Sequence, residues 1–396
     1  MDKTTLRIAI LFVLFLWNPY IASEASTPSP ARDTVMVSML VSSPGAMIWQ
    51  AGGHAAIRLQ CPAYGLDNAF SYETDNAGGT LGQLLGQARG RYVSVESREY
   101  ISHFKEEGRK VKSYPLNLTD RQIRRLWQLL DESVESGYED NFNVRFSNCN
   151  SKAIDKIIEA LDSDNLIIKD HRYITDDNGT LQKSILKDES PWATLVFNVG
   201  CGTDADKTDS WRTRMVPLMM ETCFSDALIE SADGSVRPFL AGNGETVVAG
   251  ESKKTCQALS PASLSLILLI FVVVVSLLDL SGKCRKTVRV SDIVLLAMQT
   301  AGFVALALVS IVPASIGTPW NWMYIPLNPL PLIVWVCFRG KAICARFFVF
   351  YGTVCLLFTF APMFTSEADT WSSLISVAIA VRTLSHYINQ LSKHKQ

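Results

Sequence analysis

The C-terminal third of the chain constrains its fold most strongly, because it consists largely of apolar residues. Five apolar stretches follow one another there, at residues 262–280, 293–312, 323–338, 347–363 and 371–388. A helix needs about 20 apolar residues to cross the ~30 Å hydrocarbon core of a bilayer, and the first, second and fourth stretches come near that length. Three prolines interrupt the third stretch, and the fifth carries Arg382 and His386. We therefore predict an all-α, multi-span transmembrane domain of about five helices over residues 256–396.

The distribution of positive charge predicts how these spans are oriented. Lys and Arg residues gather between the first and second stretches, between the third and fourth, and after the fifth. The segments GTPWNW and TSEADT on the other side contain neither residue. Because positively charged loops stay in the cytoplasm, the C-terminus is expected inside and the preceding domain outside. This predicts a multi-pass membrane protein whose N-terminal domain lies outside the cytoplasm.

The start of the chain is consistent with export. Lys3 and Arg7 flank the apolar run IAILFVLFLW, which is short for a span, and the small residues of ASEAS follow. We predict a signal peptide over residues 1–25, with an uncleaved anchor as the alternative. Residues 26–255 then form an exported domain that is long enough to bury its own core. The net charge of −1 for the whole chain hides this division.

One cysteine of the exported domain stands where an extended segment is expected to become a helix. In the sequence FSNCNSKAIDKIIEAL, Asn148 is a good N-cap residue, and apolar residues then recur at helical spacing. Cys149 is therefore predicted at a helix N-terminus. There the helix dipole favours the thiolate, and free backbone N–H groups can bind an oxyanion. The alternative is that Cys149 is a small buried residue at the start of a helix.

An upstream histidine favours the catalytic interpretation. His54, in QAGGHAAIRLQ, is expected at the start of a strand, and AFSYET forms a second strand. A cysteine at a helix N-terminus beside a histidine on a strand is the arrangement of thiol acyl-transfer enzymes, which also use a third polar group to orient the histidine. Tyr72 and Glu73 are candidates for that group, and strand alternation lets only one of them face His54.

The segment between the second strand and Cys149 is predicted to be mostly helical. Residues from Gly79 onward are interpreted as one or two helices leading to a strand that ends before Asn117. Thr119 followed by Gln122 is a capping-box signature, and it begins an amphipathic helix that ends at Gly137.

The cysteine and histidine spacings argue against a metal site. Of nine cysteines, five lie in the predicted exported part: Cys61, Cys149, Cys201, Cys223 and Cys256. A pair formed by Cys201 and Cys223 would close a loop of about 20 residues and stabilise the domain by roughly 3 kcal/mol. Because no CxxC or HxxxH spacing occurs, we expect no metal. We also expect no organic cofactor and no nucleic-acid partner, since the chain has no nucleotide-binding fingerprint and no basic tract.

The chain resembles a known family along most of its length. The order GGHAAIRL, FSYET, RGRYVSV, EEGRKV, YPLNLT and SNCNSKAIDKI, followed by GCGTDADK and the proline-rich NWMYIPLNPLPLI, is similar to the Lnb family of lipoprotein N-acyltransferases. The resemblance implies an α+β, circularly permuted papain-like domain in which the histidine precedes the cysteine. It implies that His54 and Cys149 are the catalytic pair and that Tyr72 and Asn148 lie near the site. It also implies a multi-pass protein of the bacterial inner membrane with its N-terminal domain in the periplasm.

The resemblance also implies a reaction. A Cys149 thioester would carry an acyl chain from a phospholipid to the α-amine of a diacylglyceryl-cysteine lipoprotein, with Asn148 and the Cys149 amide as oxyanion donors. Two alternatives use the same residues differently. A membrane-anchored papain-like amidase or peptidase of the cell wall would share the catalytic pair, although it needs only one anchor. In a non-enzymatic scaffold Cys149 would be structural, and replacement of His54 would have no effect.

Overall fold

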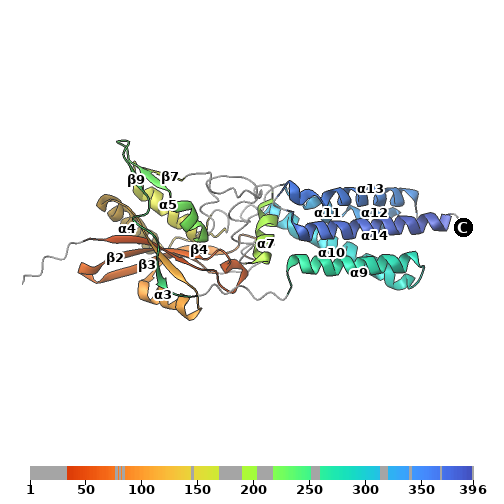
Figure 1. The fold of residues 1–396 in the computed structure, drawn as a ribbon, viewed down its shortest axis with the longest axis horizontal. Coiled ribbons are helices and arrows are strands. Elements are labelled where there is room, and N and C mark those ends of the chain that lie inside the picture. The colour runs from red at the N-terminus through yellow and green to blue at the C-terminus, as the bar shows by residue number, and fades with distance from the viewer. Residues whose placement is uncertain are drawn as a thin grey trace, which may run out of the picture.

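The computed structural model shows a sheet-rich domain at one end and a helical domain at the other, with the C-terminus at the far end of the helices (Figure 1). It describes residues 34–75, 79, 82, 85–143, 147–168, 190–202, 217–250, 259–312, 320–338, 341–365 and 368–394. The predicted α+β domain followed by a helical domain is confirmed. The signal peptide lies outside the described residues and stays a prediction.

A seven-stranded antiparallel sheet forms the centre of the first domain, in the order β10-β5-β1-β2-β3-β4-β6. Its strands are β1 (Met36–Ser42), β2 (His54–Cys61), β3 (Leu66–Thr74), β4 (Arg89–Glu96), β5 (Val111–Pro115), β6 (Asp140–Asn141) and β10 (Glu245–Val248). A smaller sheet consists of β7 (Asn165–Ile167), β8 (Leu228–Glu230) and β9 (Val236–Pro238). The central strand of the large sheet is thus β2, which begins at His54.

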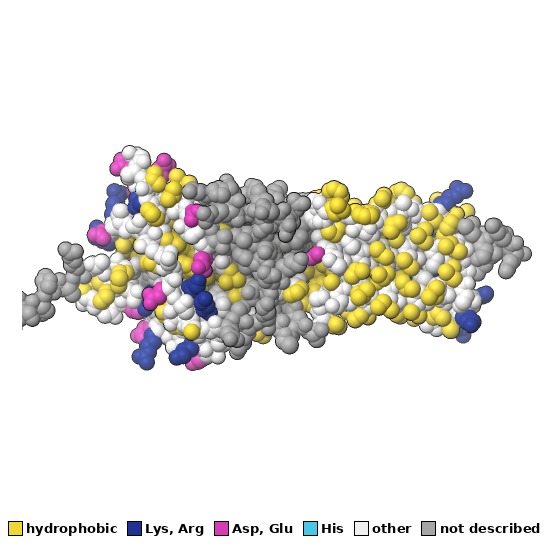
Figure 2. Space-filling view, in the orientation of Figure 1, with side chains coloured by type: hydrophobic (Ala, Val, Ile, Leu, Met, Phe, Trp, Pro, Cys, Tyr) yellow, Lys and Arg dark blue, Asp and Glu magenta, His cyan; other side chains and the backbone are white. Residues whose placement is uncertain are grey.

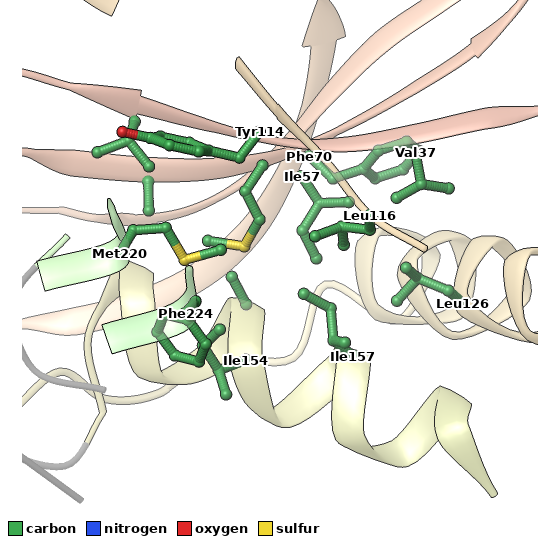
Figure 3. Close-up of a cluster of buried hydrophobic side chains, with 14 of the residues drawn as sticks. Val37, Ile57, Phe70, Tyr114, Leu116, Leu126, Ile154, Ile157, Met220 and Phe224 are labelled. Carbon is green, nitrogen blue, oxygen red and sulfur yellow. The ribbon is translucent and has the colours of Figure 1, made fainter. Parts of the chain in front are cut away.

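Helices cover both faces of the large sheet. α4 (Asp120–Glu135) and α5 (Cys149–Leu161) pack on the face that carries Ile57, whereas α3 (Ser97–Glu106) packs on the opposite face over Ala56. Neighbouring residues of a strand point to opposite faces, which places Ala56 and Ile57 in different clusters. Figure 3 shows Ile154 and Ile157 of α5 pointing toward the sheet. The apolar face of α5 therefore anchors the helix that begins with Cys149.

Ile157→Ala is expected to destabilise the first domain by about 2–5 kcal/mol, because Ile157 is fully buried between α5 and the sheet and its loss leaves a cavity. Thermal unfolding of the full chain in detergent measures the effect. Lys156→Ala is the matched control, since its partner Glu159 is partly exposed and surface ion pairs contribute little. Equal melting temperatures for the two variants would contradict this packing.

The sequence predicted the start of α4 correctly, but it did not predict a strand in the segment before α4. Thr119 and Gln122 form the expected capping box, and β5 ends before Asn117 as predicted. The prediction of one or two helices from Gly79 onward was wrong for Arg89–Glu96, which forms β4. The cause is tertiary, because Tyr92 pairs with Tyr72 across β3 and β4, with ring centroids 5.6 Å apart.

The second domain contains three helices long and apolar enough to cross a membrane, at Pro261–Leu280, Arg285–Ile311 and Ala342–Met363 of the described residues. Its elements are α9 (Pro261–Leu280), α10 (Arg285–Ile311), α11 (Tyr324–Leu327), α12 (Leu330–Phe338), α13 (Ala342–Phe358), η8 (Ala361–Met363) and α14 (Thr370–His394). On the face shown in Figure 2, hydrophobic side chains are spread along the helices of this domain, and Lys and Arg gather at the end away from the first domain. The proline-rich third stretch is broken into α11 and α12.

The remaining short elements are η2 (Ile48–Gln50), η3 (Pro62–Tyr64), α7 (Pro191–Cys201), η7 (Pro217–Met219) and α8 (Met220–Phe224). Helix α7 contacts η2 of the first domain and both α9 and α10 of the second (Figure 1). The Asn321 side chain before α11 donates a hydrogen bond to the carbonyl of Val199 in α7. Because η2 lies just before β2, the His54 end of the sheet is the end nearer the membrane helices.

Candidate active site

Cys149 is the first residue of α5, and a reciprocal cap fixes its position. The side-chain oxygen of Asn148 accepts hydrogen bonds from the backbone N–H groups of Asn150 and Ser151, both at 2.9 Å. In return, the Ser151 hydroxyl accepts from the Asn148 N–H at 2.9 Å. Cys149 itself is partly exposed. The thiol thus lies at the positive end of the helix dipole.

His54 is held by two polar groups of the neighbouring strand. Its Nε2 lies 2.8 Å from the Ser71 hydroxyl and 3.0 Å from Oε1 of Glu73, and Ser71 donates to the same carboxylate at 2.6 Å. Ala56 pairs with Ser71, so alternate residues of β2 and β3 bring His54, Ser71 and Glu73 to one face. The His54 ring stacks near Phe104 of α3, with centroids 6.0 Å apart. These contacts fix the orientation of the imidazole.

The structure brings Cys149 and His54 together. A hydrogen bond joins the His54 ring to the Cys149 side chain. Because the Ser71 and Glu73 groups occupy Nε2, Nδ1 is the ring nitrogen that can accept the thiol proton. The arrangement is therefore a thiol, an imidazole and a carboxylate in series, as nucleophilic catalysis by cysteine requires.

The charges of this series favour an ionised pair. Burial alone would lower the pKa of His54, but the charges of Cys149 and Glu73 and hydrogen bonds to both raise it well above 6.5. Burial alone would raise the pKa of Glu73, but the charge and hydrogen bond of His54 lower it to about 2. His54 is therefore an imidazolium at neutral pH, and Glu73 is a carboxylate that stabilises its positive charge.

Tyr72 lies on the opposite face from Glu73 and supports α5 instead of contacting His54. Its hydroxyl donates to the Asp140 carboxylate and lies 3.3 Å from the Ser147 hydroxyl, and Lys152 of α5 pairs with the same carboxylate. Gly90 provides the space, since a Cβ atom there would lie 2.3 Å from the Tyr72 hydroxyl. Burial and the hydrogen bond to Asp140 raise the pKa of Tyr72, which therefore stays protonated.

Sequence reasoning did not identify Ser71, Tyr100 or Phe104 as part of the site. Ser71 could have been found, because it lies two residues before Glu73 on an alternating strand. Tyr100 and Phe104 lie one turn apart on α3, and both rings pack near His54. Burial and the Glu73 charge raise the pKa of the Tyr100 hydroxyl. Nothing in the local sequence shows that α3 lies against His54.

Two further predictions concerned a disulfide and the absence of a metal site. The side chain of Cys201 lies outside the described residues, so the disulfide between Cys201 and Cys223 stays a prediction. Within the described part of the chain, no group of three or more His, Cys, Asp or Glu side chains is placed to hold a metal ion.

Glu73→Gln is expected to move the alkaline limb of the pH–rate profile to lower pH. The carboxylate raises the pKa of His54, so its removal lowers that pKa and the imidazolium loses its proton at a lower pH. The measurement is the rate of Cys149 acylation as a function of pH. Glu221→Gln is the control, because Glu221 pairs with Lys112. An alkaline limb that stays in place would show that Glu73 does not set the charge of His54.

Two family models match the chain. The Lnb N-terminal periplasmic domain matches residues 24–176, which include both His54 and Cys149, and the Lnb transmembrane domain matches residues 251–394. No curated protein and no solved structure matches the chain.

Proposed function

The chain belongs to the Lnb family, with a periplasmic N-terminal domain and a transmembrane domain, and from this premise we propose that it is a lipoprotein N-acyltransferase. Its acyl donor is a phospholipid, and its acceptor is the α-amine of a diacylglyceryl-cysteine lipoprotein. Cys149 carries the acyl chain as a thioester, and His54 moves the protons.

The observation that carries this proposal is the position of a thiol–imidazole–carboxylate series at the membrane end of the periplasmic domain. The Cys149–His54 hydrogen bond and the 3.0 Å contact of His54 with Glu73 supply a nucleophile and an oriented base. Helix α7 contacts η2 beside that site and also contacts α9 and α10. Both lipid substrates reside in the membrane, so the tether confines the search for them to its surface.

The first half-reaction forms the thioester. The Cys149 thiolate attacks the carbonyl carbon of a phospholipid ester and forms a carbon–sulfur bond. The carbon–oxygen bond to glycerol then breaks, and the His54 imidazolium gives its proton to the departing lysophospholipid oxygen. We assign the stabilisation of the oxyanion to the Cys149 N–H at the start of α5 and to the neighbouring Asn148.

The second half-reaction transfers the acyl chain. The α-amine of the lipoprotein cysteine attacks the thioester carbon, and His54, now neutral, takes a proton from the amine nitrogen. The carbon–sulfur bond breaks, an amide forms, and the thiolate–imidazolium pair returns. Glu73 holds the ring in position through both steps and stabilises its positive charge.

Mass spectrometry of lipoprotein N-terminal peptides tests this function. A host that lacks other N-acyltransferases should make lipoproteins with two acyl chains, and expression of this chain should add a third on the α-amine. The Cys149→Ala variant, expressed at the same level, is the control. Unchanged lipoproteins together with newly cleaved cell-wall peptides would support the amidase or peptidase alternative.

A further inference from the structure

A cavity of about 200 Å³ lies among the membrane helices, away from the catalytic pair. Of the eighteen described residues that line it, twelve are apolar, and none belongs to the periplasmic domain. Helices α9 to α14 all contribute to its wall. The cavity is thus a separate feature of the transmembrane domain.

The charged group at the wall of this cavity already has partners within the protein. Arg382 of α14 donates to both carboxylate oxygens of Asp292, at 2.6 and 2.8 Å, and to Asp279 at 3.0 Å. It also donates to the Ser385 hydroxyl at 2.8 Å. Because these pairs satisfy the guanidinium, the cavity does not require an anionic ligand. The pairs also hold α14 against α9 and α10.

The polar groups farther along the wall are satisfied in the same way. Gln299 of α10 donates to the carbonyl oxygens of Pro326 and Asn328, at 3.0 and 3.1 Å, and lies 2.6 Å from the Tyr351 hydroxyl. Tyr351 donates to the Pro326 carbonyl at 2.8 Å. The hydrogen-bonding capacity of this part of the wall is used inside the bundle, so its free surface suits an apolar occupant.

The broken helix beside the cavity indicates that the cavity is a built feature of the fold. Prolines interrupt the chain between α11 and α12 and free carbonyl groups that a continuous helix would bind. Gln299 and Tyr351 bind those carbonyls, while Leu327 and Trp335 face the cavity. Broken helices at membrane depth occur where they line a cavity or a binding site, whereas a simple anchor needs only a continuous helix.

We propose that this cavity binds one hydrocarbon chain of a membrane lipid. A bilayer offers no other apolar solute at comparable concentration, and a mostly apolar wall with satisfied polar groups favours methylene groups over water or ions. The same chemistry is present in the phospholipid and in the diacylglyceryl group of the lipoprotein. Binding of the chain does not depend on acyl transfer, so the Cys149→Ala variant retains it.

Photolabelling of the full chain in detergent tests the proposal. The probe is a phospholipid whose acyl chain carries a diazirine near its terminal methyl, and labelled residues are mapped by peptide mass spectrometry. We expect labels on cavity residues such as Leu296, Trp335 and Ile379. Labels spread only over lipid-facing residues, such as Ile270 and Val290, would overturn the proposal.

Two variants of the same helix make the test specific. Leu296→Trp fills the cavity and should abolish labelling inside it, whereas Ile293→Trp adds the same ring on the exposed face of α10 and should leave labelling unchanged. Thermal melting and gel filtration establish that both variants are folded. Equal labelling of the cavity in the two variants would overturn the assignment, and the wild-type map stands even if Leu296→Trp fails to fold.

Competition identifies the source of the chain. Unlabelled phospholipid and a synthetic diacylglyceryl-cysteine peptide are added separately to the labelling reaction. Loss of cavity labels with either competitor supports a hydrocarbon-chain site and names its occupant. If neither competitor reduces the labels, the labelling is not saturable and the cavity is not a specific binding site for lipid chains. This result would leave the proposed function of Cys149 unaffected.

Discussion

Replacing Cys149 with serine is expected to lower acyl transfer on the order of a thousandfold or more, because removal of a catalytic nucleophile leaves only the contribution of binding and oxyanion contacts. A hydroxyl is far less acidic than a thiol, so neither the helix N-terminus nor the His54 imidazole can ionise it to a useful extent. The measurement is the rate at which purified protein in phospholipid micelles acylates a diacylglyceryl-cysteine peptide.

The covalent intermediate gives this prediction a direct readout. Wild-type protein incubated with phospholipid alone should accumulate a thioester at Cys149 that neutral hydroxylamine cleaves, and the serine variant should not. Cys337→Ser is the matched control, because Cys337 is exposed on α12 of the transmembrane domain. A thioester on any other cysteine, or normal acyl transfer by Cys149→Ala, would contradict the thiol mechanism.

The proposed catalytic pair could be identified as a candidate from the sequence, because local signals mark both residues. Asn148 and Ser151 form a capping box, which places Cys149 at a helix start, and the alternation after His54 marks a strand. Both signals depend on only a few neighbouring residues, so they can be recognised without knowledge of the tertiary fold. Strand alternation also limits the third group to Tyr72 or Glu73, although it does not say which of the two faces His54.

Contacts between distant segments were not predictable in this way. β4 is a strand because Tyr92 pairs with Tyr72, and Asp140 joins Tyr72 to Lys152 although the three residues lie far apart in the sequence. Likewise, the stacking of Phe104 on His54 depends on where α3 crosses the sheet. Pairings of this kind are determined by tertiary packing and leave no periodic signal in the segments themselves.

In the membrane domain, too, local features were predictable from the sequence and contacts between distant segments were not. Five apolar stretches and three prolines indicate where helices run and where one breaks. The position of Gln299 opposite the carbonyls of Pro326 and Asn328 is a tertiary feature, and it explains how a broken helix is tolerated at that depth. The sequence thus predicts the interruption, whereas the cavity beside it appears only in the structure.

Replacing His54 with alanine is expected to slow acyl transfer on the order of 10²–10⁴-fold, the usual contribution of a general acid–base group. In the native protein the raised pKa of His54 keeps the imidazolium present through neutral pH. Without the ring, the thiolate forms only as pH rises through the ordinary range of a thiol, near ~8.5. The variant should therefore gain rate with increasing pH across a range in which the native rate is flat.

Alkylation of Cys149 by iodoacetamide at a series of pH values separates this effect from a loss of substrate binding, because the small reagent reports the thiolate directly. The His54→Ala profile should rise through the ordinary thiol range, whereas His103→Ala, on the exposed surface of α3, should keep the native profile. In the proposed mechanism His54 also delivers a proton to the departing lysophospholipid, so raising the pH should restore alkylation more fully than acyl transfer. If His54→Ala and native protein are alkylated with the same pH dependence, the imidazole does not activate Cys149 and the proton transfers must pass through another group.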